Sequence, residues 1–328
     1  MINAKIGINE LLFITEPIDN WTASSVGYSS RVFQGIWRQT EKVSKTVAVK
    51  ILRTDQFPHV LSLFHDEIVT LCLLRDIPGA AKLLAMGFIV SSQQIQLPKD
   101  LDQKNLRSLN GDLLFYNLEE SEEFLNELAQ INVLNFTNQN RTFSLTPFLV
   151  LKKRPFKENL LYLCNPIHAK GEILNLRKRL EVVLQVCDVL DAAYKRNIIY
   201  HDHKLSHYYF NQSLSRIHVI DWNAAKLQSK GIHQAEILMD IIKFSAHSMH
   251  YILLGCPANE IPKLGINDPE RHQIYTPNWN NNEIQLPCAV RNLIIRALDG
   301  KYQSYAEIKA DIVEILNDLS DARTIFNS

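Results

Sequence analysis

The strongest helical pattern in the chain leads directly into a segment crowded with ionisable residues. Apolar residues recur at helical spacing over residues 176–194, which predicts one long amphipathic helix. The segment after it, YHDHKLSHYYFN at residues 200–211, contains three histidines, one aspartate and one lysine. A short apolar run then ends at Asp221. Because a rigid helix fixes where this polar loop begins, we expect the loop to carry the chemistry of the protein.

These two segments resemble the catalytic loop and the metal-binding loop of the protein kinase family, whose patterns are H-R-D-L-x-x-x-N and D-F-G. On this alignment Asp202 stands at the catalytic aspartate and Lys204 at the lysine two positions later. Asp221 stands at the metal-binding aspartate. The resemblance implies that Asp202 and Lys204 are catalytic and that Asp221 binds a divalent metal ion.

The chain departs from the family pattern at several of these positions. Tyr200 replaces the family histidine, His201 replaces the arginine, and Trp222-Asn223 replaces Phe-Gly. His207 replaces the asparagine that supplies the second metal ligand. Since imidazole suits Mn²⁺ better than the hard Mg²⁺ ion, we predict metal binding by His207 with Mn²⁺ favoured over Mg²⁺.

An apolar strand pattern further upstream contains one lysine. Lys50 lies within the run TVAVKIL, where a charge is costly unless it is paired or used. Glu67 follows 17 residues later on the apolar stripe of a predicted helix. By itself Glu67 reads as an ordinary boundary residue. The resemblance identifies the two as the phosphate-binding lysine and the helix glutamate that holds it.

The remaining nucleotide-binding positions follow from the same resemblance. Of the family's glycine-rich pattern only Gly27 and Val32 are retained, and an ordinary hairpin explains this turn equally well. Ala48 lies in the strand of Lys50, and Leu151 falls just before the expected hinge. The resemblance implies that all four line the binding site of ATP.

The expected fold is therefore α+β and two-lobed, as in protein kinases. Residues 1–151 would form an N-lobe of antiparallel strands, three of them within residues 12–52, and residues 152–328 a mainly helical C-lobe. Together they would be one kinase-like domain that binds ATP between its lobes. An insert at about residues 91–146 separates two strands. An acidic helix is predicted within it at residues 119–130, where Asn117 and Glu120 have the spacing of a capping box. Regulation, partner docking and a packed flap all remain open for the insert.

Composition narrows the possible partners. The chain of 328 residues has 35 basic and 35 acidic residues, so no global charge favours nucleic acid or an anionic membrane. No apolar run is long enough for a membrane helix, and the five scattered cysteines suit reduced thiols. We therefore expect a cytoplasmic protein without nucleic-acid or membrane partners.

Two functions from different classes fit the sequence. The first is an ATP-dependent kinase that transfers the γ-phosphate to a protein Ser/Thr hydroxyl, or less readily to a small molecule, with Mg²⁺ or Mn²⁺. The second is a pseudokinase scaffold that docks a partner and binds nucleotide weakly or not at all. The retained charged residues favour the first function. The degenerate glycine loop, His207 and the short spacing of 19 residues from Asp221 to Asp240 favour the second. A metal-dependent hydrolase using His201, His203 and His207 is a weaker alternative.

Overall fold

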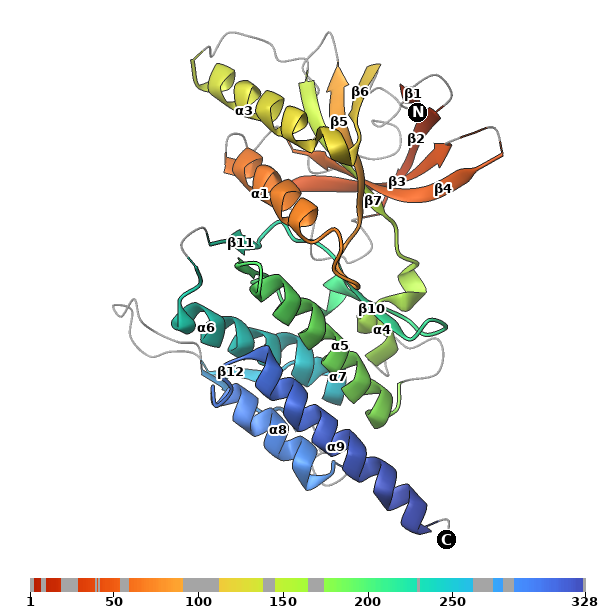
Figure 1. Ribbon diagram of the computed structural model, residues 1–328. Coiled ribbons are helices and arrows are strands. Elements are labelled where there is room, and N and C mark those ends of the chain that lie inside the picture. Colours follow the sequence, from red (N-terminus) through yellow and green to blue (C-terminus); the bar gives the residue numbers. More distant parts are fainter. Residues whose placement is uncertain are drawn as a thin grey trace. The chain divides into compact units, whose positions relative to one another are not determined.

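The computed structural model divides the chain into two compact units (Figure 1). Unit 1 comprises residues 1–75 and 81–153, and unit 2 comprises residues 76–80 and 154–328, so the chain passes between them three times. The described residues are 3–6, 10–18, 29–38, 40, 42–53, 59–90, 112–137, 145–164, 174–228, 231–261, 274–279 and 286–326.

Unit 1 is built on a seven-stranded antiparallel sheet in the order β1-β2-β3-β4-β7-β5-β6. Its strands are β1 (Asn3–Ile6), β2 (Glu10–Pro17), β3 (Ser30–Arg38), β4 (Ser44–Leu52), β5 (Leu83–Val90), β6 (Asp112–Tyr116) and β7 (Leu145–Lys152). The three strands predicted for the N-terminal region are β2, β3 and β4, and β1 is an additional strand. The two edge strands, β1 and β6, contact one another, so the sheet curls around its own core.

The side chains along β4 alternate between the core of the sheet and its opposite face. Val47, Val49 and Ile51 are buried in a core shared with Phe33 and Phe148. The intervening residues, Lys50 among them, point to the opposite face of the sheet because successive strand residues alternate. One strand thus supplies both packing and a charged group.

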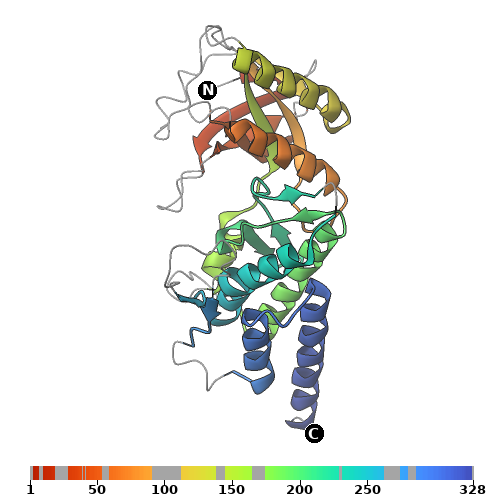
Figure 2. The ribbon, with the colours of Figure 1, turned by 90° about the vertical axis from the view of Figure 1, so that its left-hand side faces the viewer.

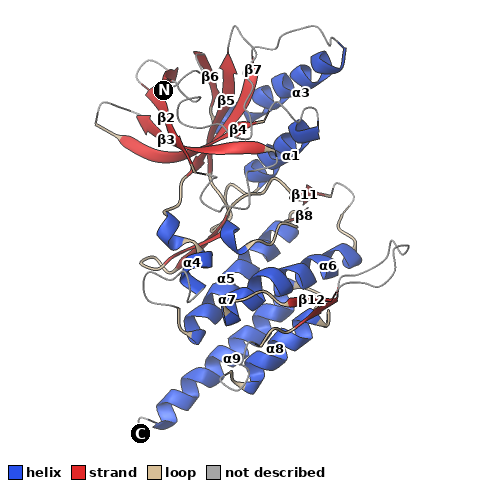
Figure 3. Cartoon of the chain, turned by 180° about the vertical axis from the view of Figure 1, so that it is seen from behind, coloured by secondary structure: helices blue, strands red, loops and turns tan. Residues whose placement is uncertain are grey.

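Two helices lie side by side on the sheet (Figures 1 and 3). They are α1 (His59–Leu73) and α3 (Ser121–Thr137), and a short 3₁₀ turn, η2 (Leu118–Glu120), leads into the second. The side chain of Asn117 accepts from the amide of Glu120, and the side chain of Glu120 accepts from the amide of Asn117. This reciprocal capping box, predicted from the sequence, fixes where the insert turns into a helix.

The described part of the insert belongs to the packing of unit 1. Strand β6 pairs with β5, and Phe124 of α3 is fully buried. The ring of Phe124 stacks on Phe88 of β5 with centroids 4.6 Å apart, and Tyr116 of β6 meets it edge-on at 5.4 Å. The described part of the insert is therefore packed against the rest of unit 1, as the hypothesis of a packed flap predicts. Residues 91–111 and 138–144 of the insert lie outside the described residues.

Unit 2 is mainly helical. Its elements are η3 (Phe156–Glu158), α4 (Leu160–Cys164), α5 (Leu176–Tyr194), β8 (Ile198–Ile199), η4 (Leu205–His207), β9 (Tyr208–Asn211), β10 (Arg216–Val219), β11 (Lys226–Leu227), α6 (Gln234–Phe244), η5 (Ser245–Met249), α7 (His250–Leu254), β12 (Asn259–Ile261), β13 (Ile274–Thr276), α8 (Cys288–Leu298) and α9 (Tyr305–Phe326). Helix α5 packs against α7 and α9, and α8 lies beside α9 (Figure 2). Among the described helices of the protein, none is both long and apolar enough to cross a membrane.

The helical segment from Gln234 to Leu254 contains a π-helical turn. Helices α6 and α7 are joined without a break by η5, in which the backbone follows a π-helix. Ser245, at the start of this turn, donates its hydroxyl to the carbonyl of Ile241 at 2.7 Å. The helix ends where Gly255 adopts a φ of 82°, a left-handed conformation that glycine tolerates best.

Replacing Phe124 tests whether the insert is part of the fold of unit 1. We expect Phe124→Ala to reduce the free energy of unfolding by about 3–5 kcal/mol, because it removes a buried ring and leaves a cavity. The measurement is urea unfolding followed by circular dichroism, with Leu114→Ala as a control because Leu114 is 43% exposed. Equal stability of both variants would show that α3 does not support unit 1.

Candidate active site

Unit 1 contains a buried ion pair between β4 and α1. The Nζ atom of Lys50 lies 2.8 Å from Oε1 of Glu67, and their side chains are only 5% and 1% exposed. Removing both charges from water is costly, and their mutual attraction seldom exceeds that cost. Such a pair is therefore weak evidence for stability.

The predicted nucleotide-binding side chains of the sheet share one face. Val32 on β3 pairs directly with Lys50, and Leu151 on β7 pairs directly with Ala48. Since paired residues and residues two positions apart point to the same side, all four side chains emerge on the face of Lys50. Gly27, the fifth predicted residue of this group, lies outside the described residues.

In unit 2 the loop between β8 and β9 is held in tight local turns. The amide of Asp202 donates to the carbonyl of Tyr200 at 2.9 Å, and the amide of Lys204 donates to the carbonyl of Asp202 at 2.8 Å. The amide of His207 donates to the carbonyl of Lys204 at 2.9 Å. His201 has a φ of 64°, a strained value for a residue other than glycine, which the surrounding contacts must stabilise.

A buried carboxylate under the loop supplies those contacts. Asp240 of α6 is 3% exposed and accepts three hydrogen bonds. They come from the amide of His201 at 3.1 Å, Nε2 of His203 at 2.8 Å and the hydroxyl of Tyr305 at 2.6 Å. The other ring nitrogen of His203 lies 3.0 Å from the hydroxyl of Tyr208. The loop is thus tied to α6 both through its backbone and through the side chain of His203.

The charge of Asp240 is stabilised by these partners. Burial alone would raise the pKa of this carboxyl, but the attraction of His203 and the hydrogen bonds from His203 and Tyr305 outweigh it. The pKa of Asp240 therefore lies below its usual value. Because a carboxylate only accepts hydrogen bonds, Nε2 of His203 must carry a proton.

Asp202, His207 and Asp221 form a cluster that is suited to a metal ion. One potential ligand atom from each lies within 4.8 Å of the others. The Nε2 atom of His207 is 3.3 Å from Oδ2 of Asp221, and its Nδ1 atom is 3.7 Å from Oδ2 of Asp202. The backbone of Asp221 has a φ of 59°, so its side chain is held in the cluster by a strained conformation. Lys204 lies beside the cluster, with Nζ 3.0 Å from the Asp202 carboxylate.

Hydrogen bonds determine which nitrogen of His207 faces the cluster as a ligand. The hydroxyl of Tyr200 donates to the carbonyl of Ile220 at 2.6 Å, so its oxygen accepts from Nδ1 of His207 at 3.1 Å. The carbonyl of Asp202, 3.2 Å from Nδ1, is a second acceptor. In the neutral ring Nε2 then holds a lone pair directed at the carboxylate of Asp221. The lone pair of Nε2 and the carboxylate of Asp221, 3.3 Å away, are therefore placed to bind the same cation.

The structure separates the three histidines of the hydrolase alternative. Both ring nitrogens of His203 are occupied, by Asp240 and Tyr208, and Nδ1 of His201 lies 3.9 Å from Asp240. Within the described residues only His207 of the three joins a possible metal cluster. The sequence pattern H-x-H is therefore a structural feature of the loop, and that alternative is wrong.

Sequence reasoning missed two supports of the loop. Asn159, which is 3% exposed, donates its side-chain amide to the carbonyl of Ser206 at 2.7 Å. Tyr305, on the last helix, reaches Asp240 across a long sequence separation. No local pattern marks either residue, because their roles depend on contacts between distant segments. Asn211, at the end of β9, donates its side-chain amide to the carboxylate of Glu158 at 2.6 Å and does not join the cluster of Asp202, His207 and Asp221.

Comparison with known proteins identifies the class of fold. No protein-family model and no curated protein sequence matches the chain. Among solved structures, the chain is similar to the kinase PK-1 of Cydia pomonella granulovirus, with 13% sequence identity and a TM-score of 0.52. The match covers 90% of this chain and 92% of that chain. The protein therefore has a kinase-like α+β fold, as predicted, and at this identity the likeness concerns the fold alone.

Removing the hydroxyl of Tyr200 tests its role in orienting His207. We expect Tyr200→Phe to weaken Mn²⁺ binding by about tenfold or more, because partners that orient a metal ligand typically contribute that much. The measurement is a titration of the protein with Mn²⁺ followed by electron paramagnetic resonance. Tyr194→Phe, at the end of α5, is the matched control. Unchanged affinity in Tyr200→Phe would contradict this role of the phenol.

Proposed function

We propose that the protein is an ATP-dependent phosphotransferase that moves the γ-phosphate of ATP to a Ser or Thr hydroxyl of a protein. The observation that carries this proposal is the cluster of Asp202, His207 and Asp221 with Lys204 beside it. These are the charged groups that phosphoryl transfer requires, gathered on one anchored loop and the strand end next to it. The kinase-like fold supports the same reaction class.

Each residue of the cluster has a distinct task in this proposal. Asp202, 20% exposed, orients the acceptor hydroxyl and takes its proton as the new P–O bond forms, the bond between the β- and γ-phosphates breaks and ADP leaves. Lys204, 60% exposed, neutralises the transferring phosphoryl group. Asp221 and His207 would hold a divalent metal ion, which when bound would supply positive charge to the phosphate oxygens. The bound imidazole is the reason to expect Mn²⁺ to be preferred over Mg²⁺.

The ion pair of unit 1 supports a nucleotide-binding role. Lys50 and Glu67 form a buried ion pair with 2.8 Å between Nζ and Oε1. An apolar pair of similar volume would stabilise the fold at least as well. The resemblance assigns Lys50 to the α- and β-phosphates, with Glu67 holding its ammonium group in place. A protein that only docks a partner has no physical need of this arrangement.

One observation favours the alternative of a pseudokinase scaffold. If His207 is protonated, its Nε2–H group pairs with Asp221 across 3.3 Å, and the cluster is then satisfied without a metal ion. In that case the loop would be a structural remnant and the protein would act through partner docking. Activity and metal binding separate the two functions.

The decisive assay is transfer of the labelled γ-phosphate from ATP to the protein itself and to a generic Ser/Thr substrate. We expect transfer that is faster with Mn²⁺ than with Mg²⁺ and that falls at least about 100-fold in Asp202→Asn, because that variant lacks the base. Asp66→Asn is the control, since Asp66 is 53% exposed on α1, far from the loop in sequence.

Two outcomes would overturn the proposal. Equal transfer by wild type and Asp202→Asn would place the chemistry elsewhere. No transfer with either metal, while ATP still raises the melting temperature, would show that the protein is a nucleotide-binding scaffold.

A further inference from the structure

Unit 1 contains a cavity that none of the predicted nucleotide-binding residues lines. This cavity of about 330 Å³ lies where the end of α1, the start of β5, η2 and the end of β7 meet. Its apolar wall consists of four leucines, Leu71, Leu83, Leu84 and Leu118. The volume lies at the lower end of the range that small-molecule sites occupy. The insert supplies part of this wall through Leu118.

Three cations border this apolar wall. They are Arg75, Lys82 and Lys152, and no carboxylate of the described residues lines the cavity with them. Neither Arg75 nor Lys152 has an ion-pair partner among the described side chains. Lys82 donates its Nζ to the carbonyl of Arg75 at 2.6 Å, which keeps its charge beside the other two. Three positive charges around an apolar cavity are electrostatically complementary to an anion with an apolar body.

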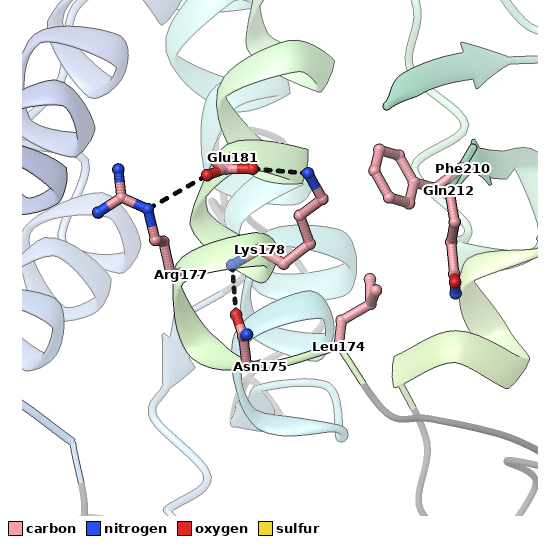
Figure 4. A pocket seen from close by; sticks show the side chains of 7 residues that line it. All are labelled: Leu174, Asn175, Arg177, Lys178, Glu181, Phe210 and Gln212. Carbon is pink, nitrogen blue, oxygen red and sulfur yellow. Dashed lines mark hydrogen bonds and ion pairs between the residues drawn. The ribbon is translucent and has the colours of Figure 1, made fainter. Parts of the chain in front are cut away.

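A comparable hollow in unit 2 has different electrostatics (Figure 4). It is lined by Lys178 and Glu181 of α5 and by Phe210 of β9, among others. There Lys178 pairs with Glu181 at 2.8 Å and with the hydroxyl of Ser215 at 2.7 Å, and Arg177 lies 3.4 Å from Glu181. Both cations of this hollow have a carboxylate partner within the protein, that of Glu181. Among the described residues that line the cavity of unit 1 there is no carboxylate.

The cations of the cavity also lie close to the places where the chain leaves unit 1. Arg75 is the last residue of unit 1 before its first crossing, and Lys82 is the second residue after the return. Lys152 is the second-last residue before the final crossing at Arg154. A ligand bound by Arg75 and Lys152 would therefore link two of the three crossing points.

We propose that this cavity binds a small amphiphilic carboxylate, with its apolar chain among the leucines and its carboxylate against Arg75 and Lys152. Guanidinium and ammonium groups form charge-assisted hydrogen bonds with a carboxylate, and the leucines exclude water from the chain. The proposal is independent of the phosphotransferase reaction, because none of these residues belongs to the cluster of Asp202.

Cys72 provides a direct readout of occupancy. This half-buried thiol lines the cavity, while the exposed thiol of Cys288 lies outside it. Burial raises the pKa of the Cys72 thiol, so alkylation is best measured at alkaline pH. The probe is octanoate, and the rate of N-ethylmaleimide addition at each cysteine is followed by peptide mass spectrometry. Octan-1-ol and acetate, which lack the charge and the chain respectively, are the comparison ligands.

We expect octanoate at about four times its dissociation constant to slow alkylation of Cys72 about fivefold and to leave Cys288 unchanged. Octan-1-ol and acetate at the same concentration should protect much less. The double variant Arg75→Gln/Lys152→Gln should lose the protection, whereas Lys157→Gln, an exposed lysine of unit 2, should retain it.

Several results would overturn the proposal. They are equal protection of Cys72 and Cys288, equal protection by octan-1-ol, and full protection in the double variant. Protection by a peptide with leucine flanked by glutamates, but not by octanoate, would show that the cavity docks a protein partner instead.

Discussion

The buried carboxylate of Asp240 is the interaction on which the candidate site of unit 2 depends. It accepts from the backbone of His201 and from the ring of His203, so it holds the loop on both sides of Asp202. These bonds stabilise the positive φ of His201, which an unsupported chain would avoid. With the loop fixed, His207 and Asp221 come within 3.3 Å of each other. The network is almost entirely buried, so losing one partner would leave another polar group unsatisfied.

A similar dependence links the insert to the ion pair of unit 1. Glu67 is placed by α1, and α1 packs beside α3, whose Phe124 is buried against Phe88. The described part of the insert therefore contributes to the framework that carries Glu67. The curling of the sheet also depends on the insert, because β6 of the insert forms the edge that contacts β1.

Local sequence signals predicted much of the fold, and long-range contacts account for what they missed. The helix at residues 176–194 and the capping box at Asn117 follow from neighbouring residues, and both are present. The extra strand β1 and the π-helical turn η5 were not predicted, because pairing and burial create them. At the site, motif spacing selected Asp202, His207 and Asp221, which the structure brings together. The orienting phenol of Tyr200 could not be foreseen, since its bonds to Ile220 and His207 exist only after folding.

The central claim is that His207 is a metal ligand in a phosphotransferase site. Pulsed electron paramagnetic resonance of bound Mn²⁺ tests it most directly, because a coordinated imidazole nitrogen modulates the spin echo of the metal ion. The account predicts nitrogen coupling that shifts when the protein is labelled with ¹⁵N-histidine and that disappears in His207→Asn while Mn²⁺ stays bound. Bound Mn²⁺ without any histidine coupling in the wild-type protein would contradict it.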